Sequence, residues 1–517
     1  MQRLTRLLRA DERSLLRGGK KGLEKESLRV TPTGKIAQTP HPATLGSALT
    51  HPHITTDYSE ALLEFITPPF SDVRQSLEFL HHIHQFVYRN LEDEMLWASS
   101  MPCPLKGANP IPIARYGSSN VGTMKHVYRR GLENRYGGLM QVIAGVHFNY
   151  SLPEDFWPFL HSFEKDSRTP QEFISDSYFA LIRNFQRLGW LIPYLFGTSP
   201  AVCKSFLSNH ANGLSEFDEG TYFGPYATSL RMSDIGYKNK VQASLNISYN
   251  NLDEYVADLV RVIETPHSDY EKIGVVVNGE YKQLNANILQ IENEYYSFIR
   301  PKQVARSGEK PTLALKRRGV EYVELRALDV DIFDPLGVNE DQLRFLEAFL
   351  VLCLLLESPP ITPAEQAEIY RNESTIASHG RDPESKLLRD GKAQTVTQWA
   401  IETCEMMKGI CEVLDENESH PNYARALDAQ TKSILDPEQT PSARTLAEMR
   451  ANKASFFGFA IDMSQRHKAY FSEQPMADAQ VQYFEDATRQ SIADQQEIEV
   501  ADELSFDDYL KRYFAQS

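Results

Sequence analysis

The sequence lacks a hydrophobic run long enough to cross a membrane. Its longest apolar segment extends only from Ala348 to Leu356, whereas a membrane-spanning helix needs about 20 apolar residues. We therefore expect a core helix there and no membrane partner. Residues 1–17 are rich in Arg and Leu, but Asp11 and Glu12 interrupt them, and no apolar stretch with a small-residue cleavage site follows. We interpret this segment as an amphipathic surface helix.

Cysteine is scarce, with five residues in a chain of 517. Five is an odd number, and the spacings match no metal-binding pattern. Cys404 and Cys411 would lie roughly 10 Å apart along a helix, which is too far for a disulfide. We therefore expect free, buried thiols in a cytoplasmic protein at all five positions, which are Cys103, Cys203, Cys353, Cys404 and Cys411.

Positive charge is also in short supply. The chain has 54 Lys and Arg against 70 Asp and Glu, which gives a formal net charge of −16. Such a protein repels nucleic acids and anionic membrane surfaces, so we expect neither as a partner. ATP is an anion as well, and a site for it would need local cations. The shares of hydrophobic and charged residues, 41% and 24%, are typical of a globular protein.

Several catalytic signatures are missing from the sequence. There is no glycine-rich phosphate loop, because the pairs Gly18-Gly19 and Gly137-Gly138 lack the surrounding pattern and are typical of ordinary turns. Nothing in the sequence suggests a Ser-His-Asp or Cys-His arrangement for nucleophilic catalysis. These gaps argue against P-loop phosphotransfer and against hydrolysis by an activated serine or cysteine.

The patterns that are present indicate an α+β protein. Alternating polarity or β-rich apolar composition predicts strands at 22–30, 60–67, 141–150, 240–250 and 320–330. Helices are predicted at 73–95 and 170–190, and Asn278-Gly279 is a strong hairpin signal. Strands separated by long helical insertions favour a mainly antiparallel sheet surrounded by helices.

A second region begins near Pro359, Pro360 and Pro363, after which the sequence is polar and mainly helical. We expect a catalytic unit at residues 1–358 and a mainly helical C-terminal region at residues 359–517. The two regions are also compatible with one single domain.

Acidic side chains lie on several strand-like stretches with apolar neighbours. Residues two or four apart in a strand share a face. Three pairs of charged residues therefore each lie on one face, namely Glu24 with Glu26, Glu60 with Glu64, and Glu324 with Arg326. One strand of this kind is typical of a solvent-facing edge, whereas several in one chain favour an interior polar cavity. Buried carboxylates take up protons unless cations compensate them, and Mg²⁺ with oxygen ligands would do so.

Other side chains could complete such a site. His147 lies between Val146 and Phe148, where a satisfied core histidine is the commoner interpretation, and as a metal ligand it would suit Mn²⁺ better than Mg²⁺. The cationic candidates for holding an anionic substrate are Arg231, Arg300, Lys302 and Arg326. Arg326 is the best of them, because it shares a strand face with Glu324 and offers a bidentate fork.

Eight segments of the sequence match a known family in order and spacing. They are 22–30 (GLEKESLRV), 45–51 (LGSALTH), 60–68 (EALLEFITP), 134–137 (NRYG), 145–147 (GVH), 193–197 (PYLFG), 290–294 (QIENE) and 306–309 (RSGE). From about residue 20 to 358 the chain resembles the bacterial glutamate–cysteine ligases (γ-glutamylcysteine synthetases) of the type 1 class. Beyond about residue 360 the resemblance fades.

This resemblance implies a glutamine-synthetase-like fold in which a mainly antiparallel sheet curls into a funnel. The implied reaction is the ATP-dependent ligation of the γ-carboxylate of L-glutamate to the amine of L-cysteine through a γ-glutamyl phosphate, the first step of glutathione biosynthesis. The implied ligands of Mg²⁺, for which Mn²⁺ could substitute, are Glu24, Glu26, Glu64, His147 and Glu324. Arg326 would stabilise the transferring phosphoryl group, with Glu324 and Glu64 as further catalytic residues.

The resemblance also implies a substrate pocket, a set of substrates and a cellular location. Its residues would be Tyr58, Tyr128, Leu132, Tyr237 and Tyr296 around cysteine, Gln141 against the substrate, and Arg231 on glutamate or phosphate. A Phe at position 58 would fit the family equally well, so a function of the Tyr58 hydroxyl is not implied. ATP, L-glutamate and L-cysteine are the expected partners of a cytoplasmic monomer.

Three alternatives stay open at this point. A ligase of the same architecture could join glutamate to an amine other than cysteine. A regulatory or metal-binding protein on the same scaffold would be catalytically silent, although such proteins typically lose the metal carboxylates that this chain keeps. A phosphagen-kinase-like phosphotransferase would bind a guanidine and would not depend on cysteine.

Overall fold

A computed structural model describes residues 2–103, 110–207, 213–236 and 245–516 of the chain. Its centre is a seven-stranded sheet in the order β11-β12-β5-β1-β3-β2, with β4 paired to the end of β1, and every pairing is antiparallel. The strands are β1 (Lys20–Val30), β2 (Ile54–Thr56), β3 (Leu62–Ile66), β4 (Met95–Leu96), β5 (Val146–Ser151), β11 (Ile299–Lys302) and β12 (Tyr322–Leu328). The predicted antiparallel sheet is therefore present.

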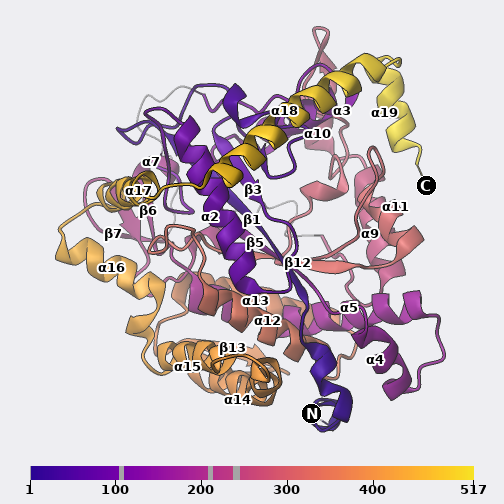
Figure 1. The fold of residues 1–517 in the computed structure, drawn as a ribbon, viewed down its shortest axis with the longest axis vertical. Coiled ribbons are helices and arrows are strands. Elements are labelled where there is room, and N and C mark those ends of the chain that lie inside the picture. The colour runs from indigo at the N-terminus through magenta and orange to yellow at the C-terminus, as the bar shows by residue number, and fades with distance from the viewer. Residues whose placement is uncertain (1, 104–109, 208–212, 237–244, 517) are drawn as a thin grey trace.

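The two faces of this sheet differ in polarity because side chains alternate along each strand. One face is buried and mainly apolar, with Leu23, Phe65, Phe148, Val323 and Leu325 all at 0% exposure. Helix α2 (Val73–Asn90) packs against β1 and β3 on this side and crosses in front of the sheet in Figure 1. The opposite face carries the charged side chains and forms the site described below.

The residues of α2 explain why a helix forms there. The Asp72 side chain accepts a hydrogen bond from the Arg74 backbone N–H and caps the first turn. Val73, Leu80, Ile83 and Val87 are buried along one side, with spacings of three, four and seven that follow the helical period. This apolar stripe covers the back of the sheet.

The remaining α-helices that the structure describes within residues 1–358 surround the sheet. They are α1 (Gln2–Leu8), α3 (Asn120–Tyr136), α4 (Phe156–Glu164), α5 (Pro170–Leu188), α6 (Leu191–Phe196), α7 (Lys204–Leu207), α9 (Leu252–Glu264), α10 (Ser268–Ile273), α11 (Pro311–Arg318) and α12 (Glu340–Leu355). The predicted core helix at 348–356 is the second half of α12, which is buried almost throughout. A three-stranded sheet of β6 (Ala201–Cys203), β8 (Thr221–Phe223) and β7 (Ser215–Glu216) lies apart from the main one.

The residues from Pro363 onward are mainly helical. They form α13 (Pro363–His379), α14 (Val396–Asp415), α15 (Asn422–Leu435), α16 (Pro441–Ala451), α17 (Phe456–Ser472), α18 (Asp478–Ala501) and α19 (Phe506–Phe514). These helices wrap around the first part of the chain, since α15 packs on α12, α17 and α18 on α2, and α19 on α3. Figure 1 shows α18 running across the upper half of the molecule toward α19.

Two local predictions need correction, and one hairpin was not predicted. The predicted strand at 141–150 begins only at Val146, because residues 140–142 form a 3₁₀ turn. Of the predicted strand at 240–250, residues 245–250 are irregular, and residues 240–244 lie outside the described chain. A hairpin of β13 (Lys386–Arg389) and β14 (Lys392–Thr395) was not predicted, although Asp390-Gly391 at its turn has the positive φ values of a hairpin turn.

The other predicted hairpin forms where Asn278-Gly279 indicated. Strand β9 (Val276–Val277) pairs with β10 (Glu280–Tyr281), and both turn residues have positive φ. Glycine and asparagine accept this backbone conformation at little cost, which is why the dipeptide marks the turn.

The cysteines do not all behave as expected. Cys103 and Cys203 form a disulfide, with their Cα atoms 5.5 Å apart, although 100 positions separate them in sequence. The prediction of five free thiols is therefore wrong for this pair, because the fold and not the sequence spacing brings the two together. Cys353, Cys404 and Cys411 are free and buried, as predicted. Among the described residues, no helix is both long enough and apolar enough to cross a membrane.

A buried ion pair links the sheet to the helices behind it. The Lys21 ammonium on β1 lies 2.8 Å from the Glu347 carboxylate on α12, and the Tyr423 hydroxyl on α15 donates to the same carboxylate at 2.6 Å. The Lys21 and Glu347 side chains are 1% and 0% exposed. This triad therefore joins residues of the expected catalytic unit to residues of the expected C-terminal region.

Replacing Lys21 alone should destabilise the protein strongly. Lys21→Met leaves the Glu347 carboxylate buried without its cation, which typically costs about 3–5 kcal/mol. We expect a clear drop in the midpoint of thermal unfolding, followed by circular dichroism. The triple variant Lys21→Met/Glu347→Leu/Tyr423→Phe removes every member of the triad and should recover most of the loss. Wild-type thermal stability in the single variant would contradict this account.

Candidate functional site

The register of the sheet gathers acidic side chains on its polar face. Glu24 on β1 pairs with His147 on β5, Glu26 pairs with Glu64 on β3, and Asn149 pairs with Glu324 on β12. Directly opposed residues of antiparallel strands point to the same side of a sheet. Four neighbouring strands therefore present the five predicted metal ligands on one surface.

Three of these side chains form a group of the size that one metal ion needs. Glu24, Glu64 and His147 each offer a ligand atom, and these atoms lie within 4.8 Å of one another. His147 Nδ1 lies 3.0 Å from Glu24 Oε2, while the Asn149 amide donates to Glu24 Oε1 at 2.8 Å. Glu324 Oε1 lies 3.7 Å from His147 Nδ1 and so borders the group.

We call the five predicted ligands, Glu24, Glu26, Glu64, His147 and Glu324, the cluster. Its carboxylates repel one another. Burial, and then the negative charges of Glu24, Asp57 and Glu26, raise the pKa of Glu64 well above its usual value. Burial and Asp57 raise the pKa of Glu26 to about 8. The site thus holds more carboxylate than it can keep ionised near neutral pH, which is the condition that a bound divalent cation relieves.

The histidine has the protonation state that a metal ligand needs. Burial, followed by the positive charge of Arg326, lowers the pKa of His147. The imidazole is therefore neutral near pH 7 and keeps a ring nitrogen available as a donor atom. Oxygen donors from carboxylates together with one imidazole nitrogen fit Mg²⁺, and Mn²⁺ more easily.

Cations border the cluster on the β11–β12 side. Arg326 Nη1 donates to Glu324 Oε1 at 3.2 Å, and Lys302 Nζ lies 3.0 Å from Glu324 Oε2. Burial opposes ionisation of Glu324, but these two charges hold its pKa well below the usual value. Glu324 is therefore ionised, and Arg326 is oriented by it from the same strand face.

Arg231 lies beneath this face, where it supports Arg326. It is 2% exposed, its Nη2 donates to the Arg326 backbone carbonyl at 3.0 Å, and its Nη1 lies 3.9 Å from Asp329 Oδ1. A Cβ atom at position 145 would lie 2.0 Å from Arg231 Nη2, so only the glycine of the Gly-Val-His segment leaves room for it. The direct grip on substrate that the resemblance implied for Arg231 stays a prediction.

Asp57 belongs to the site although the sequence did not single it out. It follows β2, and its carboxylate is near enough to raise the pKa of both Glu26 and Glu64. Thr55 on β2 pairs with Glu64, and Asp57 stands two positions further along the chain. Period-two alternation carried on from Thr55 was the signal that could have identified it.

Glu60 does not belong to the site, which corrects the prediction that it shares a face with Glu64. Strand β3 begins only at Leu62, so the alternation does not extend back to Glu60. Its carboxylate instead accepts hydrogen bonds from the backbone N–H groups of His41 at 2.5 Å and Arg115 at 2.7 Å. Glu60 therefore fixes two loops.

A cavity beside the cluster contains most of the predicted substrate-binding residues. Its walls are Asp57, Tyr58, Tyr128, Arg129, Leu132, Tyr136, Met140, Gln141, Asn293, Glu294, Tyr296, Arg300 and Arg326. We call this space the tyrosine pocket. Tyr58, Tyr128, Leu132, Gln141 and Tyr296 all line it, whereas Tyr237 lies outside the described residues.

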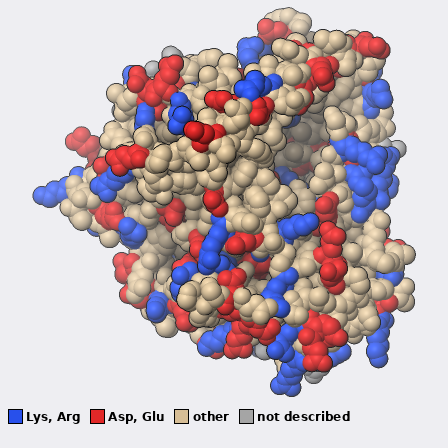
Figure 2. Space-filling view, in the orientation of Figure 1, with Lys and Arg blue, Asp and Glu red and all other residues tan. Residues whose placement is uncertain are grey.

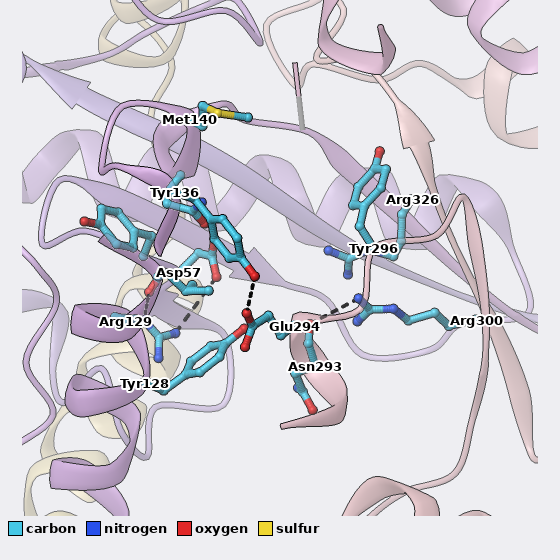
Figure 3. A pocket seen from close by; sticks show the side chains of 13 residues that line it. Asp57, Tyr128, Arg129, Tyr136, Met140, Asn293, Glu294, Tyr296, Arg300 and Arg326 are labelled. Carbon is cyan, nitrogen blue, oxygen red and sulfur yellow. Dashed lines mark hydrogen bonds and ion pairs between the residues drawn. The ribbon is translucent and has the colours of Figure 1, made fainter. Parts of the chain in front are cut away.

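Helix α3 builds one wall of the tyrosine pocket. Tyr128, Leu132 and Tyr136 are four residues apart, so they lie on one side of the helix. The Tyr136 hydroxyl donates to Glu294 Oε1 at 2.6 Å, and Figure 3 shows this pair between Asp57 and Arg300. Acidic and basic groups therefore face the same space, as recognition of an amino acid with its ammonium and carboxylate requires.

A second cavity meets the cluster at Glu24 and has a volume of about 730 Å³, which is within the usual range for a small-molecule site. We call it the large cavity. Leu152, Trp157, Ile174 and Val320 give it apolar walls, while Lys20, Gln303 and Arg318 supply polar ones. Glu24 of the cluster lines the large cavity, and Arg326, which borders the cluster, lines the tyrosine pocket, so the cluster lies between the two.

Basic residues gather next to the large cavity despite the acidic net charge. Arg318, which lines this cavity, ends helix α11, and Lys316 and Arg317 of the same helix are exposed. Figure 2 shows Lys and Arg side chains concentrated over α11 at the right of the view. An ATP site on this protein was expected to need local cations of this kind, although Arg318 and Arg317 also pair with Glu309, at 2.7 Å and 3.9 Å.

Comparison with known proteins identifies the family. The family model for glutamate-cysteine ligase matches residues 4–376. A glutamate–cysteine ligase of Alcanivorax borkumensis is 49% identical over 99% of both chains, and that of Azotobacter vinelandii is 48% identical over 99% of this chain and 98% of its own.

Solved structures agree. The glutamate–cysteine ligase of Francisella tularensis, determined in complex with AMP, has a TM-score of 0.90 at 38% identity and covers 96% of this chain and 97% of its own. A bifunctional glutathione synthetase of Pasteurella multocida has a TM-score of 0.74 at 24% identity, which shows the shared fold alone. The predicted α+β fold is confirmed, and the chain belongs to the glutamate–cysteine ligase family.

Proposed function

We propose that this chain joins the γ-carboxylate of L-glutamate to the amine of L-cysteine and cleaves ATP to ADP and phosphate. The product, γ-glutamylcysteine, is the first intermediate of glutathione biosynthesis. The observation that carries the proposal is the cluster of Glu24, Glu64, His147 and Glu324, placed between the large cavity and the tyrosine pocket. Membership of the family supports the reaction, and the two cavities provide separate places for nucleotide and amino acids.

The nucleotide is assigned to the large cavity. Its apolar walls suit a purine base, and Arg318 and Lys20 would offset the negative charge of the phosphates. The terminal phosphate would then point toward Glu24, the cluster residue that lines this cavity. The AMP bound by the Francisella relative supports a nucleotide site on this fold.

Glu24, Glu64 and His147 would hold a divalent cation, with Glu26 and Glu324 as further ligands. Magnesium is the expected ion, and manganese would accept the imidazole more readily. When bound, the cation supplies charge neutralisation between the ATP phosphates and the reacting carboxylate.

The side chains around the cluster would carry out the remaining tasks. Arg326, held by Glu324 at 3.2 Å, can place its planar fork on the phosphoryl group as it passes to the γ-carboxylate of glutamate. The amine of cysteine then displaces phosphate from the γ-glutamyl phosphate. The aromatic walls of the tyrosine pocket limit access of water, which would otherwise hydrolyse this acyl phosphate.

The setting of the reaction is inferred from the substrates. We infer a cytoplasmic enzyme that acts as a monomer on small molecules. The alternative ligase for another amine is not favoured, since the relatives that match this chain over nearly its full length are glutamate–cysteine ligases.

The proposed function is tested by measuring ADP formation from ATP with Mg²⁺ and glutamate, with and without cysteine. We expect sustained turnover only with cysteine, and a product with the mass of γ-glutamylcysteine. Serine, 2-aminobutyrate and glycine in place of cysteine test the choice of amine. Equal or faster turnover with one of these amines would contradict the assignment of cysteine, and turnover without glutamate would contradict the reaction.

Removing a cluster carboxylate should abolish ligation without unfolding the protein. Glu64→Ala is expected to lower kcat by roughly a hundredfold or more, because a ligand of the proposed cation is lost. The midpoint of thermal unfolding should stay or rise, since burial and neighbouring carboxylates already disfavour the ionised form of Glu64. Glu405→Ala, on the exposed side of α14, is the matched control. Near-normal ligation by the Glu64 variant would refute its role.

Replacing the guanidinium of Arg326 with an ammonium should impair the chemical step. Arg326→Lys keeps one positive charge but cannot make two parallel hydrogen bonds to a phosphoryl group, so kcat should fall by about tenfold or more. Arg466→Lys on the surface of α17 controls for the substitution itself. Steady-state kinetics with an unchanged kcat for the Arg326 variant would count against this role.

A further inference from the structure

Lys302 has a position that the implied ligand set and the mechanism above leave unused. It is the last residue of β11, where it pairs with Tyr322 of β12, while Arg300 pairs with Glu324. Lys302 therefore lies on the polar face of the sheet. Its ammonium is 3.0 Å from Glu324 Oε2, on the carboxylate whose other oxygen accepts from Arg326.

Lys302 does not itself line the large cavity, but its neighbours do. Gln303 and Val304, which follow Lys302 directly, line this cavity, and so does its cross-strand partner Tyr322. Glu24 also lines this cavity, and it belongs to the same polar face as Glu324, the carboxylate that Lys302 contacts. Lys302 thus lies next to residues of the large cavity and in contact with a cluster carboxylate, within reach of a terminal phosphate that points from this cavity toward the cluster.

A purely structural role explains this lysine poorly. Its side chain is 28% exposed, so it does not fill a packed core. Glu324 already has the guanidinium of Arg326 as a partner, and it borders the group of Glu24, Glu64 and His147 that would take up a divalent cation. Two cations, the lysine ammonium and the metal, would therefore compete for the oxygens of one carboxylate.

We propose that Lys302 is a further catalytic residue that binds the transferred phosphoryl group. Without ligands its ammonium pairs with the Glu324 carboxylate. When a cation and ATP are bound, the ammonium would instead contact an oxygen of the terminal phosphate. A lysine suits this exchange because its compact charge on a flexible stem can turn between two oxygen partners. The ammonium keeps its three protons and forms no covalent bond, so it contributes charge only while the phosphoryl group passes from ADP to glutamate.

This proposal rests on the proposed function for its substrate but makes a separate prediction about metal binding. Lys302→Met removes the competing ammonium and keeps most of the apolar stem. In the absence of nucleotide, the variant should bind Mn²⁺ at least about threefold more tightly than the wild type, since a partly exposed ion pair no longer opposes the cation. In the presence of ATP, glutamate, cysteine and Mg²⁺, its kcat should fall by about tenfold or more.

The experiment compares the full-length wild type with Lys302→Met, Lys302→Arg and Lys272→Met. Lys272 lies on the surface of α10 in an exposed pair with Asp269, so its variant controls for the loss of one positive charge. Mn²⁺ affinity is measured by electron paramagnetic resonance and turnover by ADP formation. Lys302→Arg should keep more activity than Lys302→Met, because it preserves the charge.

In Lys302→Met the affinity for Mn²⁺ should rise while kcat falls, and these opposite changes distinguish a catalytic role from a structural one. A structural role would weaken Mn²⁺ binding and turnover together and lower the thermal midpoint, which would overturn the proposal. Unchanged Mn²⁺ affinity or unchanged kcat in Lys302→Met would overturn it as well. If the wild type itself shows no cysteine-dependent turnover, the proposed function fails, while the Mn²⁺ comparison still tests the competition at Glu324.

Discussion

The structure depends on one electrostatic constraint, which is that several carboxylates are buried together on one face of a sheet. Burial raises the pKa of Glu26 and of Glu64, and the negative charge of Asp57 adds to the effect on both, as do Glu24 and Glu26 on Glu64. Only cations can keep such a group ionised. The chain supplies some of them in Arg326 and Lys302, which both contact Glu324, but the positive charge of Arg326 does not prevent the raised pKa of Glu64. This imbalance is what makes the cluster a site for an external divalent cation.

The rest of the fold can be understood as support for that face. The antiparallel register places the ligands opposite one another, and the apolar back of the sheet packs on α2, while Lys21 and Glu347 fasten β1 to α12. The missing side chain at Gly145 admits Arg231, which in turn holds the backbone of Arg326. The C-terminal helices complete this support, because α19 packs on α3 and α3 carries one wall of the tyrosine pocket.

Period-two alternation was enough to predict the strands that carry Glu24, Glu64 and Glu324, and the side to which they point. It failed where the strand boundary mattered, since β3 starts after Glu60. Asp57 was missed because it follows a strand of only three residues, which is too short for a pattern to stand out. The Cys103–Cys203 disulfide depends on a contact across 100 positions, and no local rule encodes such contacts. The roles of the cluster and pocket residues came from the family resemblance, because alternation alone does not distinguish a metal site from a polar strand edge.

The most direct test is the position of bound metal. Crystals of this protein grown with Mn²⁺ and a non-hydrolysable ATP analogue can be measured at the manganese absorption edge, where anomalous scattering locates the ion. The account predicts manganese in direct contact with carboxylate oxygens of Glu24 and Glu64 and a nitrogen of His147, at coordination distances of about 2.1 Å, with the terminal phosphate on the side of the large cavity. The account would be contradicted by manganese bound elsewhere, with no ion at these three side chains and the analogue distant from them.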